Sequence, residues 1–427
     1  QMAGKAALIS GRTVAKVGVV AVVLLAALLY RPLPAGMMSD SSDRIAMHVV
    51  EPLLRLFYTY PTALCGDAQC SLNWARGVMS WVGLLNGPFF NYDGKLHMRN
   101  RLWNDVKVRI YYPRDNSTVE SDGAIVFIHG GGYAVGSTEE YEGLTKTMAN
   151  MMSTRLFVSI DYRLAPETFF PGALEDCEKV LEYIIENGKA IYGVDPRKIV
   201  LMGDSAGGNA VAAITQRRRE RKAVPKILGQ VLLYPLLQLS DVQTYSYRQH
   251  KRELSGLAFI DPLTSVHYHL WYAGIDMNAH PEYARAALTN GHVNEAAKKL
   301  RDELMDYSVL PAEFRNDVGG TDLPVPTQPN KELMAQIGPF LTNPDFAPFM
   351  RRDLSNLPSA LVVTCEYDVL RDEGAIYAHR LKKAGVTTQW SHYKHGVHGM
   401  FNFPKLKITQ DALNEIKDWT MTLLLAD

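Results

Sequence analysis

Short apolar runs alternate with longer stretches of helical length along the chain from about residue 105 onward. Most of the runs are rich in Val, Ile and Leu and have the length of buried strands. The predicted strands lie at residues 107–112, 124–128, 156–160, 198–202, 227–234, 360–364 and 387–393. The predicted helices lie at residues 139–152, 171–187, 207–221, 374–383 and 408–425. Strands that alternate with helices predict an α/β fold, in which a mostly parallel central sheet is covered by helices on both faces.

Two regions interrupt this alternation. Residues 37–103 and 245–350 have an irregular or helical pattern with scattered Trp, Tyr and Pro. The second region separates two predicted strands, so we expect it to form a helical cap over one edge of the sheet. Aromatic residues of this region suit either a ligand pocket or ordinary core packing: Phe259, Trp271, Tyr272 and Tyr283. The helical stretch at 72–85, with Trp74 and Trp81, suits contact with either a membrane or the cap.

The strongest apolar segment lies at the N-terminus. From residue 13 to residue 30 only Lys16 interrupts it. At a rise of about 1.5 Å per residue such a helix is roughly 26 Å long, which matches the thin bilayer of the endoplasmic reticulum. Lys5 and Arg12 precede the run and Lys16 lies near its start, so the short N-terminus should stay cytoplasmic and the rest of the chain should be luminal. A cleavable signal peptide is the alternative, but the proline-rich segment that follows offers no small-x-small cleavage site.

These patterns predict four parts of the chain. They are a cytoplasmic tail at residues 1–12, a transmembrane signal-anchor at 13–30, an N-terminal helical or cap region at 31–104, and an α/β domain at 105–427 with the cap insertion at about 245–350. Lys and Arg together number 45, as do Asp and Glu, so the composition indicates no nucleic-acid partner.

If the part of the chain after the anchor is luminal, two further features can be interpreted. Asn116 begins the chain's single N-x-S/T sequon, in a polar loop, and is expected to carry a glycan. Cys65 and Cys70 are close enough in sequence to form a local disulfide in an oxidising compartment. Cys177 and Cys365 fall in a predicted helix and at a strand end, where buried thiols are expected.

The motif at residues 203–207, Gly-Asp-Ser-Ala-Gly, has the form of a nucleophile elbow. An apolar strand precedes it and an alanine-rich helix follows, so a sharp turn would present the hydroxyl of Ser205 at the carboxyl edge of the sheet. Small residues are required there because a strained turn leaves no room for larger side chains. The motif also occurs by chance, and its weight here comes from the rest of the chain.

A second motif, His-Gly-Gly-Gly-Tyr at residues 129–133, directly follows a predicted strand. Consecutive glycines leave backbone N–H groups free to converge on an anion, such as the oxyanion of an acyl-transfer intermediate. The expected donors are Gly131 and Gly132, or Gly130, together with Ala206 after the serine. A flexible loop or a phosphate nest is the alternative. No Gly-Lys-Ser/Thr follows, which excludes a Walker-type phosphate loop.

A serine nucleophile needs a base and an acid that orients the base. Asp368 follows a predicted strand and is the preferred acid. Its competitors are Glu366, Asp372 and Glu373, which we expect to be surface or helix-start charges. The base should come from His392, His395 or His398, and the tight turn after His398 gives it a modest advantage. No cysteine or second cluster accompanies these histidines, so no metal is expected.

The motifs and their order resemble the hormone-sensitive-lipase-like branch of the α/β-hydrolases. The segment Asp-Tyr-Arg-Leu-Ala-Pro-Glu at 161–167 is similar to a signature of that branch. The segments at 364–374 and 398–403 resemble the arylacetamide deacetylase group in particular. The likeness runs from about residue 107 to the C-terminus, and it implies Ser205 as nucleophile, Asp368 as acid and His398 as base. The group often has a cysteine where this chain has Ala134, so a disulfide from that position to Cys365 does not carry over.

The resemblance implies a membrane-anchored serine hydrolase that cleaves carboxylic esters through an acyl-enzyme, with aryl amides as a further substrate class. It implies no metal or organic cofactor. An anchor beside a capped apolar site suggests lipophilic substrates. A lipid or cholesteryl-ester hydrolase is the nearer alternative, and a non-catalytic assembly partner of membrane proteins is the more distant one.

Overall fold

The structure is a computed structural model that describes residues 30–89, 94–254, 257, 259–315 and 329–426. Its centre is an eight-stranded sheet with the order β1-β2-β4-β3-β5-β6-β7-β8. The strands are β1 (Leu96–Trp103), β2 (Val106–Pro113), β3 (Ser121–Ile128), β4 (Thr154–Asp161), β5 (Ile199–Asp204), β6 (Gly229–Leu233), β7 (Ser359–Tyr367) and β8 (Thr388–Val397). β2 pairs antiparallel with both β1 and β4, and the other neighbours are parallel.

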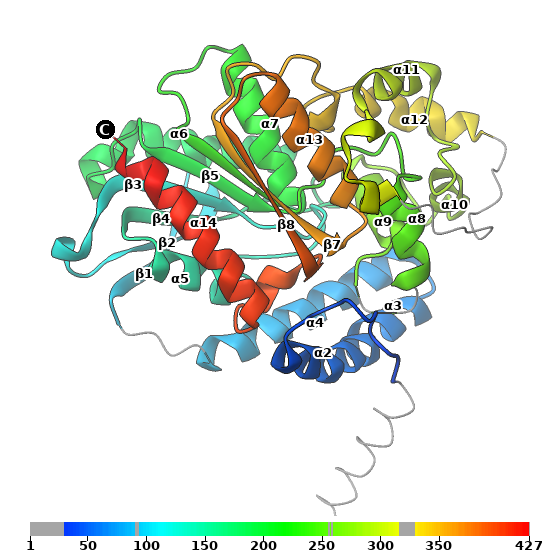
Figure 1. The fold of residues 1–427 in the computed structure, drawn as a ribbon, viewed down its shortest axis with the longest axis horizontal. Helices are drawn as coiled ribbons and strands as arrows, with labels where there is room; N and C mark the ends of the chain where they lie inside the picture. Colours follow the sequence, from blue (N-terminus) through cyan, green and yellow to red (C-terminus); the bar gives the residue numbers. More distant parts are fainter. Residues whose placement is uncertain (1–29, 90–93, 255–256, 258, 316–328, 427) are drawn as a thin grey trace, which may run out of the picture.

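Helices cover both faces of the sheet (Figure 1). One face carries α6 (Gly172–Tyr192), α7 (Ala206–Glu220) and α13 (Arg371–Lys383), and the other carries α5 (Glu142–Met151) and α14 (Lys407–Leu425). Residues 124–128 of strand β3 show why this part of its sequence is apolar. Val126 and Ile128 belong to the core under α6 and α7, whereas Ile125 and Phe127 belong to the core under α5 and α14. A parallel strand buried on both faces needs apolar side chains at every position.

The remaining helices form two groups, one from the N-terminal region and one from the segment between β6 and β7 (Figure 1). From the N-terminal region come α2 (Ser41–Leu54), η1 (Arg55–Thr59), α3 (Tyr60–Leu64) and α4 (Ala68–Phe89). From the segment between β6 and β7 come α8 (Tyr245–Glu253), α9 (Pro262–Tyr272), α10 (Glu282–Ala287), α11 (Glu295–Leu304) and α12 (Lys331–Leu341). The two groups meet where the Tyr58 and Tyr268 hydroxyls lie 3.0 Å apart. We call them together the cap helices.

The predicted α/β fold is confirmed, and each predicted strand and helix overlaps an observed one. One expectation is wrong: residues 37–103 are not irregular or helical throughout, because Leu96–Trp103 forms β1. This strand lies at the edge of the sheet and most of its residues are at least partly exposed, so it lacks an apolar run. Asn104 and Asp105 both have positive φ in the turn to β2, a conformation that these residue types tolerate.

The predicted membrane span at 13–30 lies outside the described residues, apart from Tyr30. Within the described part of the chain, no helix combines the length and the apolar character needed to cross a bilayer. Asn116 is exposed in the short helix η2 (Asn116–Thr118), and its side-chain oxygen accepts a hydrogen bond from Arg155 at 3.0 Å.

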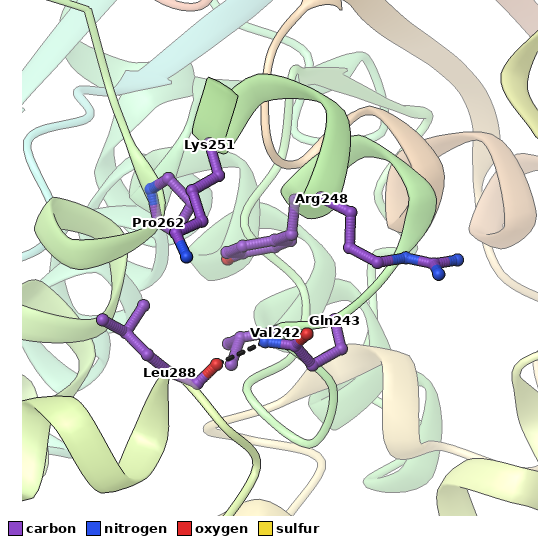
Figure 2. A pocket seen from close by; sticks show the side chains of 7 residues that line it. Val242, Gln243, Arg248, Lys251, Pro262 and Leu288 are labelled. Atoms are coloured by element: carbon purple, nitrogen blue, oxygen red, sulfur yellow. Dashed lines mark hydrogen bonds between the residues drawn. The ribbon is translucent and has the colours of Figure 1, made fainter. Parts of the chain in front are cut away.

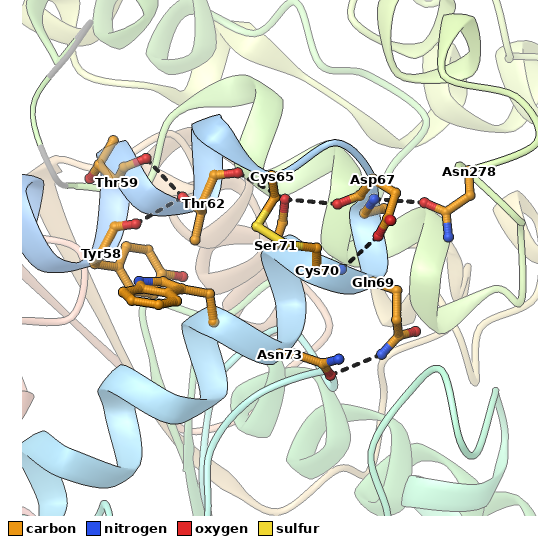
Figure 3. The surroundings of a disulfide bond; sticks show 12 residues. Tyr58, Thr59, Thr62, Cys65, Asp67, Gln69, Cys70, Ser71, Asn73 and Asn278 are labelled. Atoms are coloured by element: carbon orange, nitrogen blue, oxygen red, sulfur yellow. Dashed lines mark hydrogen bonds between the residues drawn. A yellow bond between two sulfur atoms is a disulfide. The ribbon is translucent and has the colours of Figure 1, made fainter.

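Cys65 and Cys70 form a disulfide that closes the turn between α3 and α4 (Figure 3). The Cys70 N–H donates to the Asp67 carboxylate at 2.7 Å, and the Ala68 N–H donates to Asn278 of the cap at 2.6 Å. The disulfide therefore lies where the N-terminal helices join the insertion between β6 and β7. Cys177 and Cys365 are free and buried, as expected from the sequence.

Candidate active site

Ser205 occupies a sharp turn between β5 and α7. Its backbone has φ 54° and ψ −117°, a region that non-glycine residues rarely adopt. The small neighbours are required by close packing. A Cβ on Gly207 would lie 1.9 Å from the Ile128 carbonyl oxygen, and a Cβ on Gly203 would lie 2.4 Å from that of Gly207. The turn holds the serine hydroxyl away from the backbones of β5 and α7, as a nucleophile elbow does.

Three side chains from three strand ends meet at this serine. The His398 Nε2 atom lies 3.1 Å from the Ser205 hydroxyl oxygen, and His398 Nδ1 lies 2.9 Å from Asp368 Oδ2. Asp368 is fully buried, and its other oxygen accepts the Leu370 N–H at 2.9 Å. A carboxylate held in this way fixes the imidazole tautomer whose Nε2 can accept the serine proton. The structure thus brings together the nucleophile, base and acid expected from the sequence.

The other two histidines have separate partners. His392 contacts the Thr364 hydroxyl at 3.0 Å and the Glu366 carboxylate at 3.1 Å. His395 Nδ1 lies 2.6 Å from the carbonyl oxygen of Gly36, so this histidine holds the N-terminal segment against β8. Among the described residues, no cluster of His, Cys, Asp or Glu side chains is suited to a metal ion.

The competing acids are also engaged elsewhere. Glu366 and Asp372 both pair with the buried Arg371, at 2.6 and 3.0 Å. Glu373 accepts the Leu237 N–H and a Gln238 amide N–H, both at 2.6 Å, and burial raises its pKa to about 8. The expectation of surface or helix-start charges is confirmed for Asp372 and Glu373 in their position, the first turn of α13, but both side chains are buried and not at the surface.

The glycine motif forms a loop beside the serine. Gly131 and Gly132 have φ values of +103° and +60°, which only glycine adopts without strain. Within the described part of the chain, the N–H groups of Gly131, Gly132 and Ala206 have no acceptor, as an oxyanion site requires. Gly130 does not belong to this set, because its N–H donates to the Asp204 carboxylate at 2.7 Å. The prediction of Gly130 as an oxyanion donor is therefore wrong.

Comparison with known proteins agrees with this geometry. A family model described as the alpha/beta hydrolase fold matches residues 125–300 and 325–402. The chain is 35% identical to arylacetamide deacetylase of Rattus norvegicus over 74% of this chain and 78% of the relative. The chain belongs to the arylacetamide deacetylase family of α/β-hydrolases. It is accordingly an enzyme of the carboxylic ester hydrolase class.

Other members of the wider family are similar over most of the chain. Neutral cholesterol ester hydrolase 1 of Bos taurus is 32% identical over 70% of this chain and 73% of its own. A solved structure of an esterase from the archaeon Pyrobaculum calidifontis superposes with a TM-score of 0.60 and 26% identity, over 88% of this chain and 98% of that one. The residues matched by the family model include Ser205, Asp368 and His398.

In the present member of the arylacetamide deacetylase family, the segment at residues 161–167 supports the glycine loop. The Tyr162 hydroxyl donates to the His129 carbonyl at 2.8 Å, and the Ala165 N–H donates to the Tyr133 carbonyl at 2.8 Å. Arg76 of α4 adds a bond from outside the sheet, since its Nε donates to the Ala134 carbonyl at 2.8 Å. The family motif explains the first two contacts. The role of Arg76 has no signal in its local sequence.

Tyr268 of α9 covers the loop directly and was not anticipated. A Cβ added to Gly132 would lie 2.3 Å from the Tyr268 ring, so glycine is needed for this contact as well as for its φ. Leu72 and Ala75 of α4 pack against Ala134 on the same loop. The site is accordingly enclosed: Ser205 is 6% exposed.

Replacing Gly132 with alanine should impair catalysis more than stability. We expect kcat/KM to fall by about 10²-fold, because the added Cβ and the Tyr268 ring would displace an N–H donor that is typically worth this much. Steady-state kinetics with p-nitrophenyl butyrate would measure the effect. Gly385→Ala is the matched control, since Gly385 has φ +81° but no atom within 4 Å of the new Cβ. Equal losses in both variants would contradict a role for loop position.

Asp204, the residue before the serine, is a buried carboxyl group. It accepts the Gly130 N–H and, at 3.1 Å, the Tyr141 hydroxyl. Burial is the main cause that raises its pKa to about 6 from an ordinary value of 3.8. The folded state therefore retains a proton that the unfolded chain releases near pH 4. This group's contribution to stability is complete below about pH 4 and is lost as the pH rises through about 6.

We therefore expect Asp204→Asn to flatten part of the pH dependence of unfolding. About two pKa units correspond to about 3 kcal/mol, which should be lost by the wild type between pH 4 and pH 7 but not by the variant. The hydroxyl of Tyr141 can rotate to accept from the new amide, so the variant should fold. Thermal unfolding at closely spaced pH values measures the difference. Parallel curves for the two proteins would show that Asp204 does not titrate in this range.

The aromatic residues proposed for a pocket have different surroundings. Tyr272 stacks on Tyr133 of the glycine loop, with ring centroids 3.8 Å apart. Tyr283 is fully buried within the cap, and Phe259 packs in the core shared with α14, so both are core residues. Trp271 packs beside Tyr268 and belongs to the same cap packing. Trp74 is about half exposed, and the side chain of Trp81 lies outside the described part.

A small pocket lies inside the cap, between α8 and the ends of α9 and α10 (Figure 2). Its lining includes Val242, Gln243, Tyr247, Arg248, Lys251, Pro262 and Leu288, and the Gln243 amide donates to the Leu288 carbonyl. Its volume of about 10 Å³ holds at most one water. No residue of the triad or the glycine loop lines it, so it has no part in the reaction.

Proposed function

We propose that the protein is a membrane-anchored serine esterase and deacetylase that hydrolyses lipophilic carboxylic esters through an acyl-enzyme on Ser205. The observation that carries the proposal is the continuous chain of contacts from Ser205 through His398 to Asp368. It lies beside the glycine-loop N–H groups that have no acceptor among the described residues. These are the parts that acyl transfer needs.

In the proposed reaction, the Ser205 hydroxyl oxygen attacks the ester carbonyl carbon while His398 Nε2 takes the hydroxyl proton. The carbonyl oxygen becomes an oxyanion held by the N–H groups of Gly131, Gly132 and Ala206. The intermediate collapses, the C–O bond to the alcohol breaks, and His398 returns the proton to the leaving alkoxide. Water then attacks the acyl-enzyme by the same route, which releases the acid and restores the serine. The Asp368 carboxylate stabilises the imidazolium each time it forms.

Two substrate classes fit the relatives. The name of the rat relative describes deacetylation of aryl acetamides, and the name of the bovine relative describes hydrolysis of cholesterol esters. We favour short acyl groups on lipophilic alcohols or aryl amines, because the higher identity is to the deacetylase. A lipid or cholesteryl-ester hydrolase is the second candidate.

Hydrolysis of p-nitrophenyl acetate, butyrate and palmitate, beside an aryl acetamide, tests the proposal. We expect the highest kcat/KM for acetate or butyrate and measurable release of the aryl amine. A preference for palmitate would favour the lipid hydrolase. Absence of hydrolysis of every substrate by folded protein would contradict an esterase function.

We further propose that residues 13–30 anchor the protein in the endoplasmic reticulum membrane with its body in the lumen. The apolar run, the exposed sequon at Asn116 and the Cys65–Cys70 disulfide support this placement. Expression in cells with and without a peptide N-glycosidase step tests it. The expected glycan shift should be absent in Asn116→Gln. A wild-type protein without a glycan would argue against the luminal placement.

A further inference from the structure

The helices α2, η1 and α3 follow one another without a break from Ser41 to Leu64, and they have an inverted distribution of polarity. Between residues 45 and 64, each exposed position is apolar or aromatic. These positions are Ile45, Val49, Leu53, Phe57, Tyr60, Ala63 and Leu64, and Leu64 is 85% exposed. They recur mostly at spacings of three or four residues, as on one side of a helix. We call them the apolar stripe.

The charged residues of the same helices face the protein. Asp43 accepts the N–H groups of Lys407 and Ile408 at 2.8 and 3.0 Å, so it caps the N-terminus of α14. Glu51 and Arg55 are each 1% exposed and pair at 2.7 Å. A helix on the surface of a water-soluble protein normally has the opposite arrangement, with apolar residues inward and charges outward. An apolar surface of this length without exposed charge indicates an apolar partner.

We propose that the apolar stripe lies in the interfacial layer of a lipid bilayer, as a second membrane contact beside the predicted span at 13–30. The position of Tyr30 favours this occupant. Tyr30 ends the apolar run, and its ring packs against His48 of α2 at 5.6 Å between centroids. A span that ends there would hold α2 at the membrane surface.

Aromatic residues on the stripe fit the same partner. Tyr60 is exposed on it, and Trp74 of α4 is exposed beside it, where the indole N–H donates to the Phe57 carbonyl at 2.7 Å. Tyrosine and tryptophan are enriched at membrane interfaces because their rings are apolar with one polar atom. The neighbouring residue Tyr58 points inward to Tyr268, so the membrane contact and the cover of the glycine loop belong to one helical segment.

A fluorescent label on Val49 tests the proposal in the full chain. The native thiols are either bonded in the disulfide or buried, so a new cysteine is the accessible one. Val49→Cys and the control Val224→Cys would each be labelled with a nitrobenzoxadiazole group and reconstituted in phosphatidylcholine vesicles. Val224 is also an exposed valine, but it is not on the stripe. We expect nitroxide-bearing lipids to quench the label at residue 49 at least threefold more than the label at residue 224.

This inference rests on the membrane association that is part of the proposed function. The experiment separates failure of that association from failure of the stripe proposal alone. Protein that does not float with the vesicles would contradict membrane association itself. Protein that floats, with equal quenching at both positions, would overturn the stripe proposal alone. A label at residue 49 that is shielded from water but not quenched by lipid would also overturn it, since residues 13–29 or a second copy would then cover the stripe. Ester hydrolysis plays no part in this readout.

Discussion

Ser205→Ala should be about 10⁶-fold slower in turnover than the wild type, because the hydroxyl oxygen is the atom that becomes acylated. Alanine keeps the Cβ and removes only the oxygen that lies 3.1 Å from His398. The N–H and carbonyl groups of residue 205 keep their partners, Leu233 and Leu236, so the elbow should retain its shape. Hydrolysis of p-nitrophenyl butyrate, followed with enough protein to detect one millionth of the wild-type rate, measures the loss.

A loss of this size is informative only if the variant folds. Ser159→Ala is a matched control, since Ser159 is a fully buried serine on β4 away from the triad. Both variants should unfold within a few degrees of the wild type, and only Ser205→Ala should lose activity. Residual turnover above about one thousandth of the wild-type rate would mean that another group can serve as nucleophile.

The parts of this fold that were predictable from sequence are those in which burial determines residue type. The central strands are apolar because both of their faces are covered, as Ile125 and Val126 show on opposite faces of β3. Edge strand β1 has no such requirement. Its exposed Arg99 and Asn100 interrupt the apolar pattern by which the other strands were predicted. The signal that could have revealed β1 is the Asn-Asp pair at its turn, which favours a two-residue hairpin.

The three residues of the triad were predictable from the sequence. Which backbone N–H groups form the oxyanion site was not. The sequence gives three equivalent glycines, and what separates Gly130 from the others is a carboxylate from Asp204, which lies 74 residues away. Likewise, Tyr58 and Tyr268 meet across 210 residues, from two regions with no repeated pattern. Contacts of this kind depend on tertiary structure, so they cannot be predicted from the local sequence.

The buried acids show a second limit. Charged residues are expected at the surface because burial of an unpaired charge is costly. Asp372 is nevertheless buried because Arg371 pairs with it and the Ser246 N–H donates to it at 2.7 Å. Glu373 is tolerated because two N–H donors face it and its raised pKa favours the neutral form. The position of both residues in the first turn of a helix was predictable from the sequence. Their burial was not, because it also depends on partners distant in the sequence: Ser246 for Asp372, and Leu237 and Gln238 for Glu373.

Asp368→Asn should reduce kcat by about 10⁴-fold, the loss typical of an imidazole held in the wrong tautomer. The structure gives the reason. One carboxylate oxygen of Asp368 accepts the Leu370 N–H and the other faces His398 Nδ1. The backbone N–H of Leu370 can only donate, so the new side chain must place its carbonyl oxygen there. Its NH₂ group then faces Nδ1, which must accept, and the ring proton moves to Nε2, where it blocks removal of the serine proton.

Glu366→Gln provides the control. Glu366 lies near the end of the same strand, but its partners are Arg371 and His392 and not His398. Its kcat should remain within a few-fold of the wild type, since Arg371 keeps its ion pair with Asp372. Kinetics of both variants, beside thermal unfolding, separate an effect on the tautomer from an effect on folding. If Glu366→Gln lost as much kcat as Asp368→Asn while both remained folded, the acid would act through the general charge of this strand end. A large loss in Asp368→Asn alone would mean that one hydrogen bond to Nδ1 sets the direction of proton transfer.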